Sequence, residues 1–243
     1  MFIENPNLPK GRVTLVAVSS LYPSILSQII HMGIRVIPIV PYSHLERPIQ
    51  SHGDMVLHHM GGSKLFLAKH QDDLFLALKN FGFSPEYIEE DIAPSYPADV
   101  ALNSLRIGEK LFCNQLFTSK KILQKGIVHP VKQGYSKCSV AVVSEHAVIT
   151  GDEGMAKAMK ASGVEVLKIQ SEKIILDGYD NGFIGGCCGK ISGEMLLFTG
   201  DISSLPDYKA IKEFTGRHGV TVHCLKGKLV DIGGILPLME ENP

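Results

Sequence analysis

The chain has 243 residues, 44% of them hydrophobic, which is enough to fill the core of one large domain. Lys and Arg number 24 against 25 Asp and Glu, so no net field attracts nucleic acid or an anionic membrane. The longest apolar runs are shorter than the ~20 residues that cross a bilayer. The first residues lack the pattern of a signal peptide. We therefore expect a cytoplasmic protein without nucleic-acid or membrane partners, of unknown oligomeric state.

Cysteine usage indicates a reducing compartment. An odd, sparse set in a chain of this size is not a disulfide framework, and there is no Cys-x-x-Cys pair to bind zinc. The sequence therefore predicts neither a metal site nor a cofactor. The cysteines are Cys113, Cys138, Cys187, Cys188 and Cys224.

A helical stretch that ends in Gly, followed at once by a β-branched or aromatic segment, recurs five times. Gly is favoured just past a helix end because it enters the left-handed region without steric cost. The intervals of roughly 35 to 55 residues are typical of a repeat architecture, with an insertion in the longest unit. The five residues are Gly33, Gly82, Gly126, Gly163 and Gly219.

A predicted helix precedes each of these glycines. The motif Thr-Gly-Asp ends the second strand in two of the units, and its Asp is expected to cap the following turn in both. The expected helices are Tyr22–Met32, a stretch behind Asp72, the short Ser119–Lys125, and stretches behind Asp152 and Leu205.

Two predicted strands precede each helix. The second strands are Val13–Val18, Lys64–Ala68, Leu111–Asn114, Ala147–Thr150 and Leu196–Thr199. The first strands are Met55–Leu57, Val100–Leu102, Val140–Val143, a stretch from Phe183, and Ile235–Met239.

These elements predict a single α/β domain over residues 1–243, built from five strand-strand-helix-strand units. One unit is divided between the chain ends, and pairing of the last strand with the first closes the ring. The alternative is an open doubly wound sheet, which has about one strand per helix rather than three.

Two motifs within this repeat resemble those of the penteins. His52-Gly53-Asp54 is similar to the His-x-Asp segment that supplies a catalytic His and a guanidinium-binding carboxylate, and residues 231–237 are similar to the terminal Gly-Gly strand. The resemblance implies a five-bladed α/β propeller. Penteins include arginine deiminase, dimethylarginine hydrolase and amidinotransferase, and also the non-enzymatic ribosome anti-association factor of archaea and eukaryotes.

The chain departs from the pentein enzymes at two places. Pro237, or an apolar neighbour, stands where the terminal strand normally carries the nucleophilic Cys. The His-x-Asp segment lies in the first complete unit, whereas the enzymes have it just before the last. Without that thiolate, an amidino-enzyme intermediate needs another nucleophile.

Cys138 is the candidate substitute. It opens the first strand of its unit, in register with Asp54 and Asp99, and the adjacent Lys137 is expected to lower its thiol pKa. If His52 and Asp54 lie on a strand, both face the channel. The purely structural alternatives are that Cys138 is a core residue, that His52 hydrogen-bonds to a loop and that Asp99 caps a turn.

The glycine-rich run at residues 181–190 is not a phosphate loop, because Ile occupies two positions at which a Walker motif needs Gly and Ser or Thr. Its glycines are expected to let the backbone approach the channel closely. The similar Gly-Tyr loops at Tyr135 and Tyr179 are expected on the same rim. The predicted ligand-binding set is Asp99, Lys137, Asn181, Gly185, Gly186 and Asp231.

Two functions follow from these residues. The first is a pentein-like protein that binds a small guanidino- or amine-type ligand. As an enzyme it would be a hydrolase or would resemble an amidinotransferase, with Cys138 as nucleophile and His52 and Asp54 as catalytic partners. The second is a non-catalytic binding module like the ribosome factor. The cluster of His52, Asp54 and Cys138 favours the first, and the missing terminal Cys favours the second.

Overall fold

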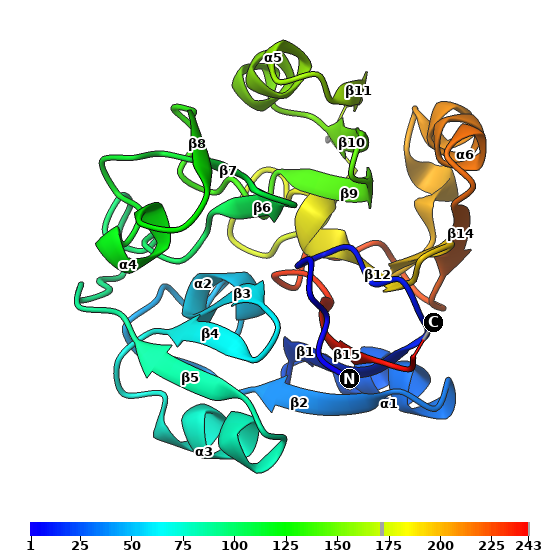
Figure 1. The fold of residues 1–243 in the computed structure, drawn as a ribbon. Helices are drawn as coiled ribbons and strands as arrows, with labels where there is room; N and C mark the ends of the chain where they lie inside the picture. Colours follow the sequence, from blue (N-terminus) through cyan, green and yellow to red (C-terminus); the bar gives the residue numbers. More distant parts are fainter. Residues whose placement is uncertain (171–172, 243) are drawn as a thin grey trace.

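The computed structural model describes residues 1–170 and 173–242, which form five three-stranded sheets arranged as blades around a central axis (Figure 1). In each blade the first and second strands are antiparallel, and the second and third are parallel and joined by a helix. The five predicted units are therefore confirmed, and the molecule has the architecture of an α/β propeller.

The blades share one order of elements. The first strands, which surround the axis, are β15 (Leu236–Glu240), β3 (Leu57–Gly61), β6 (Leu105–Ile107), β9 (Val140–Ser144) and β12 (Cys188–Ser192). The middle strands are β1 (Val13–Ser19), β4 (Lys64–Leu67), β7 (Lys110–Cys113), β10 (Ala147–Thr150) and β13 (Met195–Phe198). The outer strands are β2 (Arg35–Ile39), β5 (Ser84–Tyr87), β8 (Ile127–Pro130), β11 (Glu165–Lys168) and β14 (Thr221–Cys224).

The helices that join middle and outer strands lie on the periphery of the ring. They are α1 (Pro23–His31), α3 (Asp72–Asn80), the single turn α4 (Lys120–Leu123), α5 (Glu153–Ala161) and α6 (Tyr208–Arg217). Three shorter turns complete the set: α2 (Gly53–Val56), η1 (Ile184–Cys187) and η2 (Ile202–Ser204).

The ring closes through the two ends of the chain. β15 pairs antiparallel with β1, with Val13 opposite Glu240 and Ala17 opposite Leu236. This confirms the predicted divided unit and excludes an open doubly wound sheet. The pairing does not remove every sheet edge, because each blade is a separate sheet with two edge strands of its own.

The glycines that end the helices have the predicted backbone conformation. All five have positive φ, from 69° at Gly219 to 114° at Gly126. The Thr-Gly-Asp motifs also behave as expected, since Asp152 accepts a hydrogen bond from Met155 N and Asp201 accepts one from Ser203 N.

Substituting Ala at Gly163 or Gly219 should lower the free energy of unfolding by about 1 kcal/mol. No atom of the described chain lies within 4 Å of a Cβ built at either position, so the penalty comes from backbone strain alone. Gly216 is the matched control, because it lies inside α6, is equally unobstructed and has no positive φ. There Ala should stabilise by roughly 0.5–1 kcal/mol. Urea denaturation of the three variants checks this. A change in the free energy of unfolding that has the same sign in all three would contradict it.

Three of the predicted first strands begin later than expected. The segment at Asp54 is the helical turn α2, Val100–Leu102 lies in a turn before β6, and the stretch from Phe183 passes through η1 before β12. These segments are apolar because they are buried at the centre of the ring, and burial alone does not distinguish a turn from a strand. We had expected His52 and Asp54 to lie on one face of a strand. Because this segment is not a strand, they do not.

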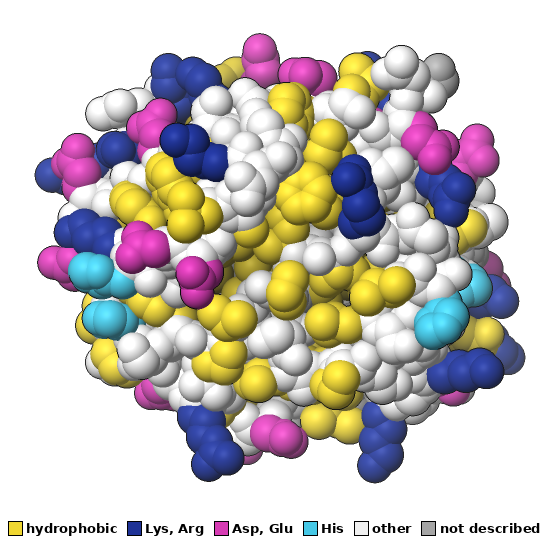
Figure 2. All heavy atoms as spheres, turned by 90° about the horizontal axis from the view of Figure 1, so that it is seen from below, with side chains coloured by type: hydrophobic (Ala, Val, Ile, Leu, Met, Phe, Trp, Pro, Cys, Tyr) yellow, Lys and Arg dark blue, Asp and Glu magenta, His cyan; other side chains and the backbone are white. Residues whose placement is uncertain are grey.

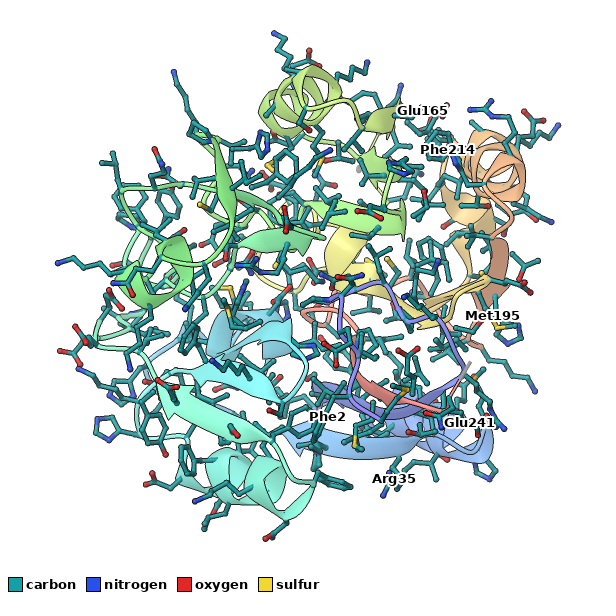
Figure 3. The ribbon with its side chains drawn as sticks, in the orientation of Figure 1. Phe2, Arg35, Glu165, Met195, Phe214 and Glu241 are labelled. Atoms are coloured by element: carbon teal, nitrogen blue, oxygen red, sulfur yellow. The ribbon has the colours of Figure 1, made fainter. Side chains whose placement is uncertain are left out.

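Residues 1–12, here called the N-terminal segment, cross the end of the ring at which the β-hairpins lie (Figure 1). Ile3 O accepts from Gly62 N at 3.0 Å in the β3–β4 hairpin, and Glu240 Oε2 accepts from Lys10 N and Gly11 N at 2.6 Å each. The Phe2 ring lies 4.6 Å from that of Phe83 in the next blade (Figure 3). The segment thus covers one end of the channel.

Neighbouring blades also meet at the periphery. Glu165 on β11 accepts hydrogen bonds from Arg217 and His218 at the end of α6, at 2.8 and 3.0 Å. Figure 3 shows Glu165 and Phe214 on facing elements of these two blades. Hydrophobic side chains also gather on the face that carries α1 and α3 (Figure 2), where Ile30 and Leu76 are exposed.

Within the described residues, no helix is both long enough and apolar enough to cross a membrane.

Candidate functional site

Five turns meet at the end of the channel opposite the N-terminal segment. Each turn precedes the first strand of a blade, and three pairs of successive turns are joined by backbone hydrogen bonds. Gly186 N donates to Cys138 O at 3.1 Å, Ile232 N donates to Gly186 O at 2.9 Å, and Ser136 N donates to Asn103 O at 3.2 Å. The turns comprise residues 52–54, 99–103, 136–138, 185–186 and 231–234.

Cys138 lies at the centre of this cluster. Its thiol donates to Asp54 Oδ2 at 2.9 Å and accepts from Asn103 Nδ2 at 3.0 Å. Asn103 Oδ1 in turn accepts from the backbone N–H groups of Lys137 and Cys138, at 2.9 and 3.2 Å. One amide side chain therefore fixes both the turn and the sulfur. Asn103 was missed in the sequence, although an amide directly before a strand at the channel end marks such a role.

His52 and Asp231 come from turns that are far apart in sequence. His52 Nδ1 lies 3.8 Å from Asp231 Oδ1, and both side chains are buried. The Asp231 carboxylate accepts from Gly233 N at 3.0 Å and Phe183 N at 2.8 Å. His52 Nε2 and Asp54 Oδ1 have no hydrogen-bond partner within residues 1–170 and 173–242. Two buried polar atoms of this cluster thus remain available to a ligand.

Three glycines are required by this close approach. A Cβ at Gly233, where φ is +75°, would collide with the His52 backbone. A Cβ at Gly186 would collide with the Asp231 carboxylate, and one at Gly185 with the carbonyl groups of the Cys138 turn. The glycine-rich run therefore lets backbone approach the channel closely, as predicted.

Lys137 supplies positive charge to the cluster. Its Nζ lies 3.9 Å from Asp54 Oδ2 and donates to Gly185 O at 3.2 Å. His52, Asp54, Lys137, Cys138 and Asp231 are thus brought together, along with Gly185 and Gly186.

The expectation of an activated thiol is wrong for the free protein. Burial, followed by repulsion from Asp54 and Asp231, raises the pKa of the Cys138 thiol well above its ordinary value, and Lys137 opposes this only in part. Burial also raises the pKa of Asp54, again partly offset by Lys137. Cys187 and Cys188 are both buried as well.

Asp99 lies apart from the thiol. Its Oδ2 accepts from Tyr135 OH at 2.6 Å, and burial raises its pKa. Asn103, from the same turn, lies beside Cys138 where Asp99 was expected. Asn181 is exposed, two residues before the Phe183 amide that binds Asp231.

The rim loops, defined here as residues 40–51 and 173–183, meet beside this end of the channel. Tyr179 OH donates to Glu46 Oε2 at 2.8 Å and so joins the two loops. The Tyr135 ring lies 6.0 Å from that of Phe183. Burial, followed by the hydrogen bond to Asp99, raises the pKa of Tyr135, and Tyr179 adds to the effect.

Replacing Asp54 with Asn should stabilise the protein at neutral pH. Because the folded-state pKa of Asp54 is raised, its ionised form destabilises the fold above the ordinary pKa of ~3.9. We expect the free energy of unfolding to rise by about 1 kcal/mol at pH 7, because the substitution removes an unfavourable buried charge. The gain should disappear near pH 4, where the folded Asp54 is protonated. Thermal unfolding across pH checks this, with the exposed Asp91→Asn as control. A loss at pH 7 would contradict it.

Among the described residues, no group of three His, Cys, Asp or Glu side chains is arranged to hold a metal ion.

The solved structures that resemble this chain include guanidino-modifying enzymes. Inosamine-phosphate amidinotransferase from Streptomyces griseus matches with a TM-score of 0.60 and 12% identity, over 100% of this chain and 98% of that one. Dimethylarginine dimethylaminohydrolase from Pseudomonas aeruginosa, in complex with citrulline, matches with a TM-score of 0.56 and 11% identity, over 88% and 92%. Agmatine deiminase from C. jejuni matches with 0.51 and 8%, over 93% and 90%. The chain thus has the pentein fold.

Within that fold, the sequence places the chain in a particular group. Residues 17–236 match the family of unknown function DUF6873, and the chain belongs to that family. No curated protein matches the chain.

Proposed function

We propose that the cluster at Cys138 binds a small guanidino compound and hydrolyses it. The observation that carries this proposal is the pair of buried carboxylates, Asp54 and Asp231, which together exceed the single positive charge of Lys137. A buried excess of negative charge is unfavourable, and a bound cation relieves it without protonation of the carboxylates. A planar guanidinium has five N–H donors that suit carboxylate oxygens, and the unpartnered Asp54 Oδ1 offers one such acceptor.

The bound cation also provides the activation that the free thiol lacks. Positive charge beside Cys138 offsets the repulsion from the two carboxylates and lowers the thiol pKa toward the neutral range. Asn103 Nδ2, 3.0 Å from the sulfur, stabilises the resulting thiolate. His52 is the acid–base group, because its Nε2 is unpartnered within the described chain. Cys138 is therefore the nucleophile that replaces the missing terminal cysteine.

The ligand reaches this cluster from the side of the rim loops. The opposite end is covered by the N-terminal segment, whereas the two rim loops are joined by the exposed Tyr179–Glu46 hydrogen bond. An exposed side-chain hydrogen bond contributes little to stability and opens readily. Tyrosine rings and carboxylates also suit a cation at this rim.

A non-catalytic binding module is the second candidate. It is favoured by the burial of Cys138, by its raised thiol pKa and by the apolar residues at Leu236 and Pro237 of the terminal strand. In that case a guanidino ligand binds without reacting, or the channel end only supports a protein surface.

Thermal unfolding with agmatine, arginine, citrulline and putrescine tests the proposal. Citrulline is the neutral counterpart of arginine, and putrescine is a cation without a guanidino group. The two guanidino compounds should raise the melting temperature, equivalent to about 2.7 kcal/mol at 100 times the Kd. Asp231→Ala should abolish the shift, and Asp91→Asn should retain it. Equal shifts with citrulline, or none with any guanidino compound, would exclude a guanidinium site.

A further inference from the structure

A small cavity lies inside the channel, between the Cys138 cluster and the N-terminal segment. Its volume is about 30 Å³. Asp54 and Lys137 line it from the site end, Asn7 from the opposite end, and His58 and Ser104 from β3 and the start of β6. Asn7 Nδ2 donates to Arg106 O at 3.2 Å and fixes the N-terminal segment over it.

The hydrogen-bonding groups of this cavity can be assigned from their contacts. His58 Nδ1 lies 3.2 Å from Leu102 O, which can only accept, so Nδ1 carries the proton and Nε2 is a lone-pair acceptor. Burial, reinforced by Arg106, lowers the pKa of His58 to about 3, so the ring is neutral. His58 Nε2 and Asp54 Oδ1 are both buried and unpartnered within the chain the structure describes. Lys137 Nζ is a donor on the same wall.

Asp54 Oδ1 and His58 Nε2 as acceptors and Lys137 Nζ as donor match one water molecule. His59 and Arg106 also line this volume, and His59 Nδ1 and Arg106 Nε are further buried polar atoms without a partner in the described chain. Water needs roughly 10–15 Å³ of such space and typically makes about three hydrogen bonds when buried. A cation such as ammonium would donate to both acceptors but would be repelled by Lys137.

We propose that the cavity binds a water molecule through Asp54, His58 and Lys137, and that this water hydrolyses the covalent intermediate formed on Cys138. The site assignment is independent of turnover, whereas the chemical role rests on the proposed function. A water molecule in this chemical role would make the protein a hydrolase and not an amidinotransferase.

The chemistry balances in two steps. The Cys138 thiol passes its proton to His52, and the thiolate forms a C–S bond with the guanidino carbon while a C–N bond breaks. The departing amine takes that proton from His52. The water then adds to the same carbon and gives a proton to Asp54, whose other oxygen contacts the sulfur at 2.9 Å. Breaking the C–S bond releases a protonated urea-type product, which returns its extra proton to Cys138, and the proton on Asp54 passes to the departing amine. The net reaction consumes one guanidinium and one water and releases one urea-type product and one ammonium-type cation, with Cys138, His52 and Asp54 restored.

Two amide substitutions of His58 separate the water site from the fold. In His58→Asn the side-chain N–H can still donate to Leu102 O, but no atom reaches the position of Nε2. In His58→Gln an amide oxygen reaches that position and can accept from water. Both variants remove the imidazole, so each controls for the other. His58 is thus tested as a positioning residue.

The first readout is a ligand-free crystal structure at a resolution that shows ordered water. Density for water in contact with Asp54 Oδ1 and residue 58 is expected in the wild type and in His58→Gln, and should be lost in His58→Asn. Absence of that density in the wild type, a different species such as an ion, or persistence in His58→Asn would overturn the site.

The second readout is intact-mass spectrometry during single turnover with agmatine. The fraction of protein that carries an adduct on Cys138 should decay about 10²-fold more slowly in His58→Asn than in the wild type. The rate at which the adduct forms should be unchanged. Partial rescue is expected in His58→Gln. Equal decay in all three proteins would overturn the hydrolytic role while leaving the water site intact. No adduct in any of them would refute the proposed function and the role together, and the crystallographic result would still decide the site.

Discussion

Deleting residues 232–243 should leave a chain that no longer unfolds cooperatively. The deletion removes β15, which pairs along β1 and contributes the buried Ile235, Leu236 and Leu238. Each buried aliphatic side chain stabilises by about 1.5–3 kcal/mol, so their sum is comparable to the 5–15 kcal/mol of a whole domain. Loss of Glu240 also releases the N-terminal segment, whose Lys10 and Gly11 amides it binds.

The measurement is thermal unfolding followed by near- and far-ultraviolet circular dichroism. Deletion of residues 241–243 alone is the matched control and should change the melting temperature little, because these residues follow the last strand. A single substitution, Leu238→Ala, should lower the free energy of unfolding by 2–5 kcal/mol, as expected for a fully buried leucine. A truncated protein with an unchanged melting temperature would refute closure of the ring through β15.

Replacing Cys138 with Ala should abolish turnover of any guanidino substrate, by roughly 10⁴-fold or more, while the substrate still binds. The reason is that, within residues 1–170 and 173–242, Cys138 is the cysteine that hydrogen-bonds to Asp54, and the carboxylates that bind the cation remain. Release of amine or urea-type product measures turnover, and thermal shift measures binding. Cys113→Ala is the control, since it removes an equally buried thiol in β7.

Turnover that survives in Cys138→Ala would exclude this thiol as the nucleophile. A wild-type protein that binds guanidino compounds without releasing product would instead identify the channel end as a binding module. The two outcomes therefore distinguish the enzyme from its rival.

The repeat was predictable because its markers are local. A glycine past a helix end is dictated by the left-handed φ that Gly33 or Gly163 adopts, and this requirement is the same in every blade. Pairing of the last strand with the first followed from counting strands per helix. The one-turn helix α4 shows the limit of the method, because the predicted Ser119–Lys125 extends beyond Lys120–Leu123 at both ends.

The site was less predictable because it depends on where the turns go. Val100–Leu102 has the composition of a strand, but its burial comes from a turn at the channel end. A turn, not a strand, presents Asn103 to Cys138, and the amide was therefore missed. The charge neighbourhood of Cys138 was misjudged for a similar reason. Lys137 is adjacent in sequence, whereas Asp54 and Asp231, which raise the thiol pKa, approach only in the folded ring.

A structure determined with bound agmatine tests the central claim most directly. We predict a planar guanidino group that contacts Asp54 and Asp231, with its carbon facing Cys138 Sγ and the Tyr179–Glu46 hydrogen bond broken or displaced. Crystallising Cys138→Ala would keep the ligand intact during the measurement. A Cys138 cluster that remains closed around its own side chains, with agmatine bound elsewhere or only at the rim, would contradict the assignment of this cluster as a guanidino site.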